Sequence, residues 1–546
     1  MTANKPDKLD SNLLKAVKLA KLTNSIDPLL EIDGIDKIIP KLPAYDLYAI
    51  ITKTGLNDAI ELIEYATPQQ IQIFLDFDCW NKDKIRLARY LDWLQALLHI
   101  GFEKIGNFVD EIDPSMTGYF LIQSAHIFNL KEQTPPEFND AIYYQTPDLF
   151  FELRPKAGIN EDVWKALMEL IDNLYRYNIE LALHILSNSM WDTSFNLQEN
   201  AYKASKDRLE MLGFWDYYDA LSVYRMTDPA RIKLDEKTRD YIKSNEETIL
   251  PVLPSVFKKE SSFHTAYKNL RDNKAEEINK AVLHLINKMA AADRVTPDDD
   301  EGFSRIIKLA FGSINLGIAY VSKNKENDFN RALNNISISR LFSCGYSLGL
   351  QLKTLALTLS RSGHISISPR TSTLLEGDWL RFYNAITKGH PTFHLGLLDR
   401  EEEVFFTSLE QISFAGTLIE DMSKLKVFVF NYLKIPPEIL TEEGLKGLSR
   451  KQPGEITFGD MLRTSALSFH YTRNYSVKSV PAKLVNQFEQ DRTTMKPVKF
   501  YEKITDVFAE KLDDKLKFSN LHRIIKTNLE PLFTQTPLAL YVVSEK

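Results

Sequence analysis

Cysteine and long apolar runs are scarce in this chain of 546 residues. The two cysteines, Cys79 and Cys344, are far apart and neither belongs to a Cys-x-x-Cys pair, which argues against a disulfide framework and a structural zinc site. The longest apolar stretch, Leu348 to Leu359, contains Gln351 and Lys353 and falls short of the ~20 residues that a membrane-spanning helix needs. We therefore expect a protein without a transmembrane segment.

Clustered positive charge and phosphate-binding loops are also lacking. The formal net charge of −7 at pH 7 disfavours a general attraction to nucleic acid or anionic lipid. Neither Gly-x-x-x-x-Gly-Lys-Ser/Thr nor Gly-x-Gly-x-x-Gly occurs, so a standard phosphate cradle is not expected. Residues Met1 to Ser11 are polar and no apolar signal segment follows them. These features predict a cytoplasmic protein with no bound cofactor and no nucleic-acid partner.

The composition is that of an ordinary globular protein, with 44% hydrophobic, 26% charged and 11% aromatic residues. A chain of this length is too long for one core, since domains average roughly 150 residues. Composition shifts and proline-rich stretches divide it into four predicted segments: an N-terminal helical-repeat domain (1–130), a β-hairpin insertion followed by a helical domain (131–250), a central helical domain (251–435) and a C-terminal helical region (436–546).

Two stretches of the N-terminal segment share one pattern. In residues 62–75 and in residues 108–121, the pattern predicts the end of one helix and the start of the next. A capping residue (Thr67 or Asp113) is followed by a proline, and a new apolar helix face begins there. Residues 38–51, around Pro43, are a looser third copy. Because one such unit cannot bury its apolar stripe alone, the copies predict stacked helical hairpins in an α-solenoid-like arrangement.

The remaining segments predict helices with few strands. Residues 141–144 and 149–153 are apolar and flank a turn-forming Gln-Thr-Pro-Asp sequence, which predicts a small β-hairpin insertion. Short aromatic-rich runs within 389–406 read as further strands, and helical periodicity covers 162–186, 197–224, 261–363 and 409–433. The predicted fold class is therefore mainly α.

Several aromatic-rich stretches resemble an uncharacterised bacterial family with a domain of unknown function, of a deltaproteobacterial type. The resemblance rests on residues 43–48, 75–80, 91–94 and 199–224, and covers most of the chain. The family has no assigned activity, so no functional residue is implied. The N-terminal repeats are also similar to the cytoplasmic helical domain of magnesium transporters, a resemblance that implies a regulatory or interaction role.

One stretch fits a catalytic pattern. Gly345-Tyr346-Ser347-Leu348-Gly349 matches the Gly-x-Ser-x-Gly turn of α/β-hydrolases, where a strand precedes and a helix follows the serine. Residues 336–342 could be that strand, and a triad would combine Ser347 with Asp378 or Asp399 and with His470. The chain lacks the alternating strands and helices of a doubly wound sheet. The opposing interpretation makes both glycines close-packing points between helices.

Metal-binding patterns are equally sparse. His390 and His394 stand four apart but no Glu completes His-Glu-x-x-His, so they are weak metal candidates against the simpler interpretation of hydrogen-bonded histidines. Asp76, Asp78 and Asp83 surround Cys79 and could bind a divalent ion or a basic partner, although a packed helix end with solvated carboxylates explains them as well.

The sequence therefore favours a non-enzymatic helical-repeat protein that acts as an interaction or regulatory scaffold. Its N-terminal repeats would bind protein partners in the grooves between stacked helices. A serine hydrolase using the segment around Ser347 is the alternative hypothesis.

Overall fold

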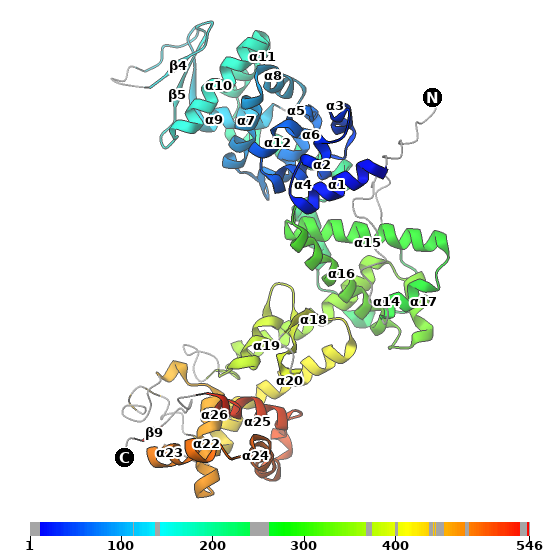
Figure 1. Cartoon of the computed structure of the whole chain (residues 1–546), viewed down its shortest axis with the longest axis vertical. Coiled ribbons are helices and arrows are strands. Elements are labelled where there is room, and N and C mark those ends of the chain that lie inside the picture. The colour runs from blue at the N-terminus through cyan, green and yellow to red at the C-terminus, as the bar shows by residue number, and fades with distance from the viewer. Residues whose placement is uncertain are drawn as a thin grey trace. The chain divides into compact units, whose positions relative to one another are not determined.

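The computed structural model describes residues 11–112, 114–136, 142–240, 261–366, 374–398, 402–435, 441, 443, 452–474, 480–535 and 543–544. The fold is mainly α, as predicted, and the strands are confined to small sheets of two or three (Figure 1). The described residues form two compact units: unit 1 contains 11–223 and 283–306, and unit 2 contains 224–240, 261–282 and those beyond 306. The four segments predicted from the sequence stay a prediction.

Unit 1 is built on helices whose apolar faces share one core. That core includes Tyr48, Phe74, Trp93, Phe108 and Phe120, all of them buried. Its longer helices are α1 (Ser11–Thr23), α4 (Ala44–Thr54), α5 (Ile60–Tyr65), α6 (Pro68–Asp78), α7 (Leu87–Ile100), α8 (Phe102–Glu111), α9 (Ser115–Ser124), α10 (Glu161–Tyr177), α11 (Ile179–Trp191) and α12 (Ser194–Met211). Short elements connect them: α2 (Asp27–Leu30), α3 (Ile35–Ile38), the hairpin of β1 (Trp80–Asn81) and β2 (Lys84–Ile85), and α13 (Tyr217–Ala220).

Proline marks the start of a helix at each of the three places where the sequence pattern recurs. The Thr67 side chain accepts a hydrogen bond from the Gln70 amide and the Gln70 side chain returns one to the Thr67 amide, a capping box that begins α6 at Pro68. Helix α9 begins directly after Pro114 and α4 directly after Pro43. The predicted cap followed by proline is present at α6, whereas Pro114 and Pro43 themselves precede the first helical residue and Asp113 lies outside the described residues. The description of the unit as a repeat stays a prediction.

A three-stranded antiparallel sheet interrupts the helices of unit 1. The predicted hairpin is present as β4 (Tyr144–Gln145) paired with β5 (Phe151–Pro155). A third strand, β3 (Ala125–Asn129), pairs with the other edge of β5, giving the order β3-β5-β4. The N-terminal segment that was predicted to be helical up to residue 130 ends in a strand, because the chain becomes extended at Ala125 and forms its hydrogen bonds with β5.

Unit 2 is a second helical assembly. Its elements are α14 (Ser262–Lys268), α17 (Glu326–Asn335), α18 (Ile338–Arg361), α19 (Gly377–Thr387), β6 (Thr392–His394), β7 (Glu403–Phe405), α20 (Leu409–Val427), α22 (Phe458–Thr472), β8 (Val480–Pro481), α23 (Ala482–Asp491), α24 (Pro497–Lys511), α25 (Leu521–Leu529), α26 (Pro531–Thr534) and β9 (Val543–Ser544). Helices α15 (Asp272–Asp293) and α16 (Asp300–Val321) have residues in both units. Within the described ranges, no helix has the length and apolar character needed to cross a bilayer.

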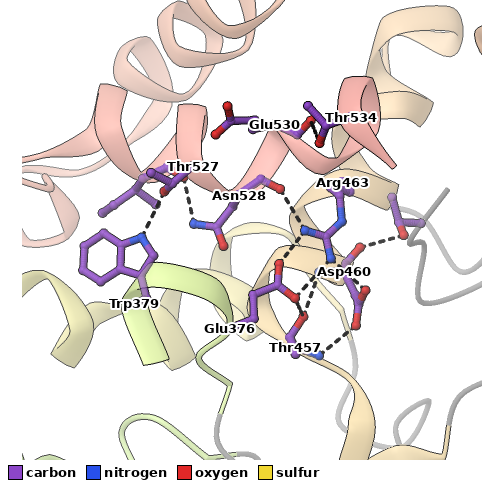
Figure 2. A network of polar contacts seen from close by, with 11 residues as sticks. Glu376, Trp379, Thr457, Asp460, Arg463, Thr527, Asn528, Glu530 and Thr534 are labelled. Carbon is purple, nitrogen blue, oxygen red and sulfur yellow. Dashed lines mark hydrogen bonds and ion pairs between the residues drawn. The ribbon is translucent and has the colours of Figure 1, made fainter. Parts of the chain in front are cut away.

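A buried arginine joins three helices of unit 2 (Figure 2). Arg463 of α22 is 1% exposed and donates to Asp460 of the same helix at 2.8 Å and to the Asn528 carbonyl of α25 at 2.9 Å. It also pairs with Glu376, directly before α19. Because both carboxylates and the guanidinium have partners, the ions are buried without an unpaired charge.

Glycine is required beside this network. A Cβ atom at Gly459 would stand 1.7 Å from Oε1 of Glu376 and 2.7 Å from Nη1 of Arg463. Any larger residue would displace the Glu376 carboxylate from the guanidinium. The start of α22 is further fixed by a capping box between Thr457 and Asp460, so Asp460 serves both the helix end and the ion pair.

We expect Arg463→Met to lower the free energy of unfolding of unit 2 by about 3–5 kcal/mol, because Glu376 and Asp460 would lose their buried counter-ion. Arg231→Met is the matched control, since Arg231 pairs with Asp228 at 3.3 Å on an exposed surface, where an ion pair contributes about 0–1 kcal/mol. Urea unfolding followed by circular dichroism measures both changes. Equal losses in the two variants would contradict the role given to Arg463.

Candidate functional site

Unit 1 contains an open cavity of about 680 Å³, which we call the aromatic cavity. It is lined by the end of α6, the β1–β2 hairpin, the start of α7, helix α12, the segment before α13 and residues 290–298. Its aromatic side chains include Phe77, Trp80, Tyr202, Phe214, Trp215 and Tyr217. The volume lies within the range of about 300–1,000 Å³ typical of small-ligand sites.

The floor of the cavity is fixed by Asp78, the last residue of α6. Its buried carboxylate accepts hydrogen bonds from the Trp93 indole at 2.9 Å and from Nε of Arg89 at 3.1 Å, and Arg86 lies 3.6 Å from Oδ1. The bond to Asp78 raises the pKa of the Arg89 guanidinium. The carboxylate therefore ties the end of α6 to the first turns of α7.

A second buried carboxylate ties α6 to α12. Asp76 accepts two bonds from Arg208, at 2.7 Å from Nε and 2.9 Å from Nη2. Burial raises the pKa of Asp76, and the bidentate bond to Arg208 opposes that rise. The sequence interpretation of Asp76 and Asp78 as solvated carboxylates is wrong, because both are buried and are paired with arginines.

The β1–β2 hairpin presents Trp80 to the cavity. Lys82 takes the turn in a left-handed conformation, with φ of 61°. The Trp80 ring lies 5.5 Å from the Tyr202 ring of α12, measured between centroids. Tyr202 in turn donates to Asp216, whose other carboxylate oxygen accepts from the Tyr218 amide at 3.0 Å. One aromatic wall is thus held by hydrogen bonds from two separate segments.

Buried polar atoms of the lining, among them one donor and one acceptor, lack a hydrogen-bond partner within the described part of the chain. The Trp80 indole nitrogen is buried and donates to nothing there, and Oδ1 of Asp298 is buried and accepts nothing there. An unsatisfied buried group costs about 1–3 kcal/mol, so native proteins rarely retain one without a reason. The Trp80 nitrogen is a donor and the Asp298 oxygen is an acceptor, and both residues line the same cavity. A polar ligand bound there would form hydrogen bonds with both atoms.

A second feature of unit 1 is an exposed aromatic edge, which we call the α11–α12 edge. Trp191 at the end of α11 is 75% exposed and Phe195 at the start of α12 is 70% exposed. Trp191 borders a groove of about 350 Å³ that is also lined by Gly118, Ile185 and Leu197. Large aromatic side chains that are left exposed are a feature of protein-interaction sites. The sequence analysis did not single out either residue.

Ser347 lies inside a helix. Helix α18 begins at Ile338, so most of the stretch 336–342 that could have been a strand is helical. The Ser347 side chain is buried and its hydroxyl accepts from the Thr227 amide at 2.9 Å. A Cβ atom at Gly345 would stand 2.0 Å from the Ser313 carbonyl of α16, so this glycine allows two helices to approach closely.

The predicted triad partners have other contacts. His470 packs on Tyr471 and Phe500, and burial lowers its pKa. Asp378 bonds to His394 at 2.9 Å, and Asp399 lies outside the described residues. Of the residues that the structure describes, only Thr227 is hydrogen-bonded to the Ser347 side chain.

The two histidines named as weak metal candidates have separate partners. Nδ1 of His390 lies 2.9 Å from the Tyr346 hydroxyl, and Nε2 of His394 lies 2.9 Å from Asp378. Across the described ranges, no group of three or more His, Cys, Asp or Glu side chains is arranged to hold a metal ion. The acidic run before α16 acts as a helix cap, since Asp299 accepts from the Gly302 amide at 2.7 Å.

Fold and site together define a mainly helical protein whose candidate site is an aromatic pocket formed by helix ends and a hairpin. The chain belongs to a family of unknown function, DUF6178, whose model matches residues 8–536. No curated protein and no solved structure matches it. The predicted membership of a domain-of-unknown-function family is confirmed, and the likeness to magnesium transporters finds no support among these comparisons.

We expect neither cysteine to react with iodoacetamide at pH 8 in the folded protein. Both thiols are buried; burial raises the pKa of Cys344 to about 12 and that of Cys79 well above its usual value, and the thiolate is the nucleophile. Mass spectrometry should find both residues alkylated in urea and neither in buffer. Rapid labelling of Cys79 in the folded protein would contradict the packing of α6 described here.

Ser347→Ala tests the hydrolase hypothesis. We expect a fluorophosphonate probe to leave Ser347 unlabelled in the folded protein, and the alanine variant to unfold at lower urea concentration, with a loss of about 1 kcal/mol because the partly buried Thr227 amide loses its acceptor. Labelling that disappears with Ser347→Ala in an otherwise stable protein would show the opposite.

Proposed function

We propose that this protein is a non-enzymatic interaction protein with a regulatory role, and that unit 1 contains its binding surfaces. The observation that carries the proposal is the α11–α12 edge, where Trp191 and Phe195 are exposed and Trp191 borders a groove. Tryptophan and phenylalanine are enriched in the buried centres of protein interfaces, because each buries a large apolar area with few rotatable bonds. The partner on this edge would be another protein.

The electrostatics of unit 1 also support binding over catalysis. Two of the carboxylates that line the aromatic cavity, Asp76 and Asp78, are engaged with arginines. A general base must reach the proton that it removes, and a carboxylate that is saturated by a guanidinium is poorly placed to do so. A cytoplasmic location fits the two reduced, buried cysteines and belongs to the same proposal.

The test uses the full-length tagged protein, expressed in its own cells and recovered with bound proteins for mass spectrometry. We expect the double variant Trp191→Ser/Phe195→Ser to lose its specific partners, because each substitution removes a large apolar contact worth about 2 kcal/mol or more at a hot spot. The matched control is Leu355→Ser/Val498→Ser, which removes two exposed apolar side chains from unit 2.

Retention of the partners by the control and their loss from the Trp191 variant would support the proposal. The same partner set on both double variants would contradict it, as would the absence of any partner that is reproducibly enriched over untagged cells. Circular dichroism of both variants checks that neither substitution unfolds the protein, which is expected because all four side chains are more than half exposed.

A further inference from the structure

The aromatic cavity is not explained by protein docking on the α11–α12 edge. Its lining combines flat rings, an unpartnered donor, an unpartnered acceptor and a set of cations. We propose that it binds a nucleoside monophosphate, with the base on the aromatic wall and the phosphate at the outer cations. This goes beyond the proposed function, since it gives the interaction protein a small-molecule effector.

The two unpartnered atoms define the inner end of the ligand. The Trp80 indole nitrogen can only donate, and Oδ1 of an ionised Asp298 can only accept. A guest that satisfies both must therefore carry an acceptor and a donor. The edge of a nucleobase presents ring nitrogens or carbonyls beside amino or imino groups, which is that combination on one rigid plane.

The aromatic lining favours a flat ligand. Trp80 and Tyr202 contact each other at 5.5 Å and Phe77 packs edge-on against Phe214 at 4.8 Å, so the rings are held in place by one another. Trp215 is held by Lys288, whose ammonium lies 4.3 Å from the ring centroid. Stacking of a base on such side chains contributes about 1–3 kcal/mol, whatever the base.

Two cations define the outer end of the ligand. Lys82 and Arg294 are exposed residues of the lining, and both have left-handed backbone, with φ of 61° and 56°. Arg294 bonds to the neutral Asn81 amide at 2.7 Å, and the Lys82 ammonium lies 5.5 Å from the Tyr217 ring. Within the described residues, neither cation forms an ion pair with a carboxylate.

Three acids of the cavity have other cations beside them: Asp76 is paired with Arg208, Asp78 with Arg89, and Asp216 lies 3.9 Å from the Lys206 ammonium. Asp293 and Asp298 also line the cavity. Lys82 and Arg294 are available to a phosphate group, which they would bind as two point charges and not through a glycine-rich loop. The absence of such a loop from the sequence is consistent with recognition by side chains.

The experiment is isothermal titration of the full-length protein with AMP, GMP, CMP and UMP, with the four parent nucleosides and with inorganic phosphate. We expect at least one nucleotide to bind saturably at one site per chain, more tightly than its nucleoside and than phosphate. Trp80→Phe keeps a ring but removes the N–H donor, and should weaken binding about 10-fold.

Lys82→Met/Arg294→Met separates the two ends of the ligand. This variant should weaken the nucleotide about 5- to 10-fold and leave the affinity of the nucleoside unchanged, because only the phosphate contacts are lost. Trp164→Phe is the matched control for Trp80→Phe, since Trp164 of α10 does not line the cavity, and this variant should bind nucleotide as the unmodified protein does.

Two results would overturn the inference: no nucleotide of the panel binds, or binding is the same in the unmodified protein, in Trp80→Phe and in Lys82→Met/Arg294→Met. Inorganic phosphate that binds as tightly as the nucleotides would likewise rule out recognition of the base. These failures are separate from a failure of the proposed function, because retention of protein partners is measured with variants of the α11–α12 edge and without added nucleotide.

Discussion

The candidate site depends on the hydrogen bonds that the Asp78 carboxylate accepts. Asp78 lies at the end of α6, is buried, and accepts hydrogen bonds from Trp93 and Arg89 of α7. An unpaired carboxylate at this depth would cost several kcal/mol, so the helix end and the first turns of α7 must stay together. The residues directly after Asp78 form the β1–β2 hairpin, and the direction in which Trp80 enters the cavity is set by that constraint.

In both units, buried charged side chains are stabilised by an arginine that bonds to groups on another helix or segment. In unit 1 the pair Asp76–Arg208 joins α6 to α12, and in unit 2 Arg463 joins α22 to α25 and to the segment before α19. Each arginine is held by at least two hydrogen bonds, so the desolvated ions have defined geometry. Such pairs specify which helices meet, whereas apolar contacts alone would tolerate sliding. Charged residues at buried positions here are therefore structural, and the polar atoms left without partners in the aromatic cavity stand apart from them.

Most helices could be predicted because short sequence patterns mark where they begin and end. The features that the sequence analysis missed depend on contacts between residues that are far apart in the chain. The Thr67-Pro68 cap and the turn before β5 are encoded within a few residues, and both are where the sequence indicates. Strand β3 was missed because its partner, β5, is the second strand of the β4–β5 hairpin and is distant from β3 in the sequence. The pattern around Ser347 was ambiguous because close helix packing needs glycine as much as a catalytic turn does.

The candidate site was harder to predict than the fold. The bond between Asp76 and Arg208 joins residues 132 positions apart, and no pattern of residue spacing in the sequence predicts such a pair. The exposure of Trp191 was equally hidden, since a helical pattern does not reveal which apolar side chains are left uncovered.

A high-resolution crystal structure of the protein, purified from its own cells without a ligand-stripping step, tests most directly whether the aromatic cavity is a recognition site. We expect density for a bound organic molecule that accepts a hydrogen bond from the Trp80 indole and donates one to Asp298, with its flat part against the ring of Tyr202. Ordered water molecules alone on both atoms, in a cavity otherwise filled by solvent, would contradict a ligand-binding role and would make the aromatic lining a packing feature of unit 1.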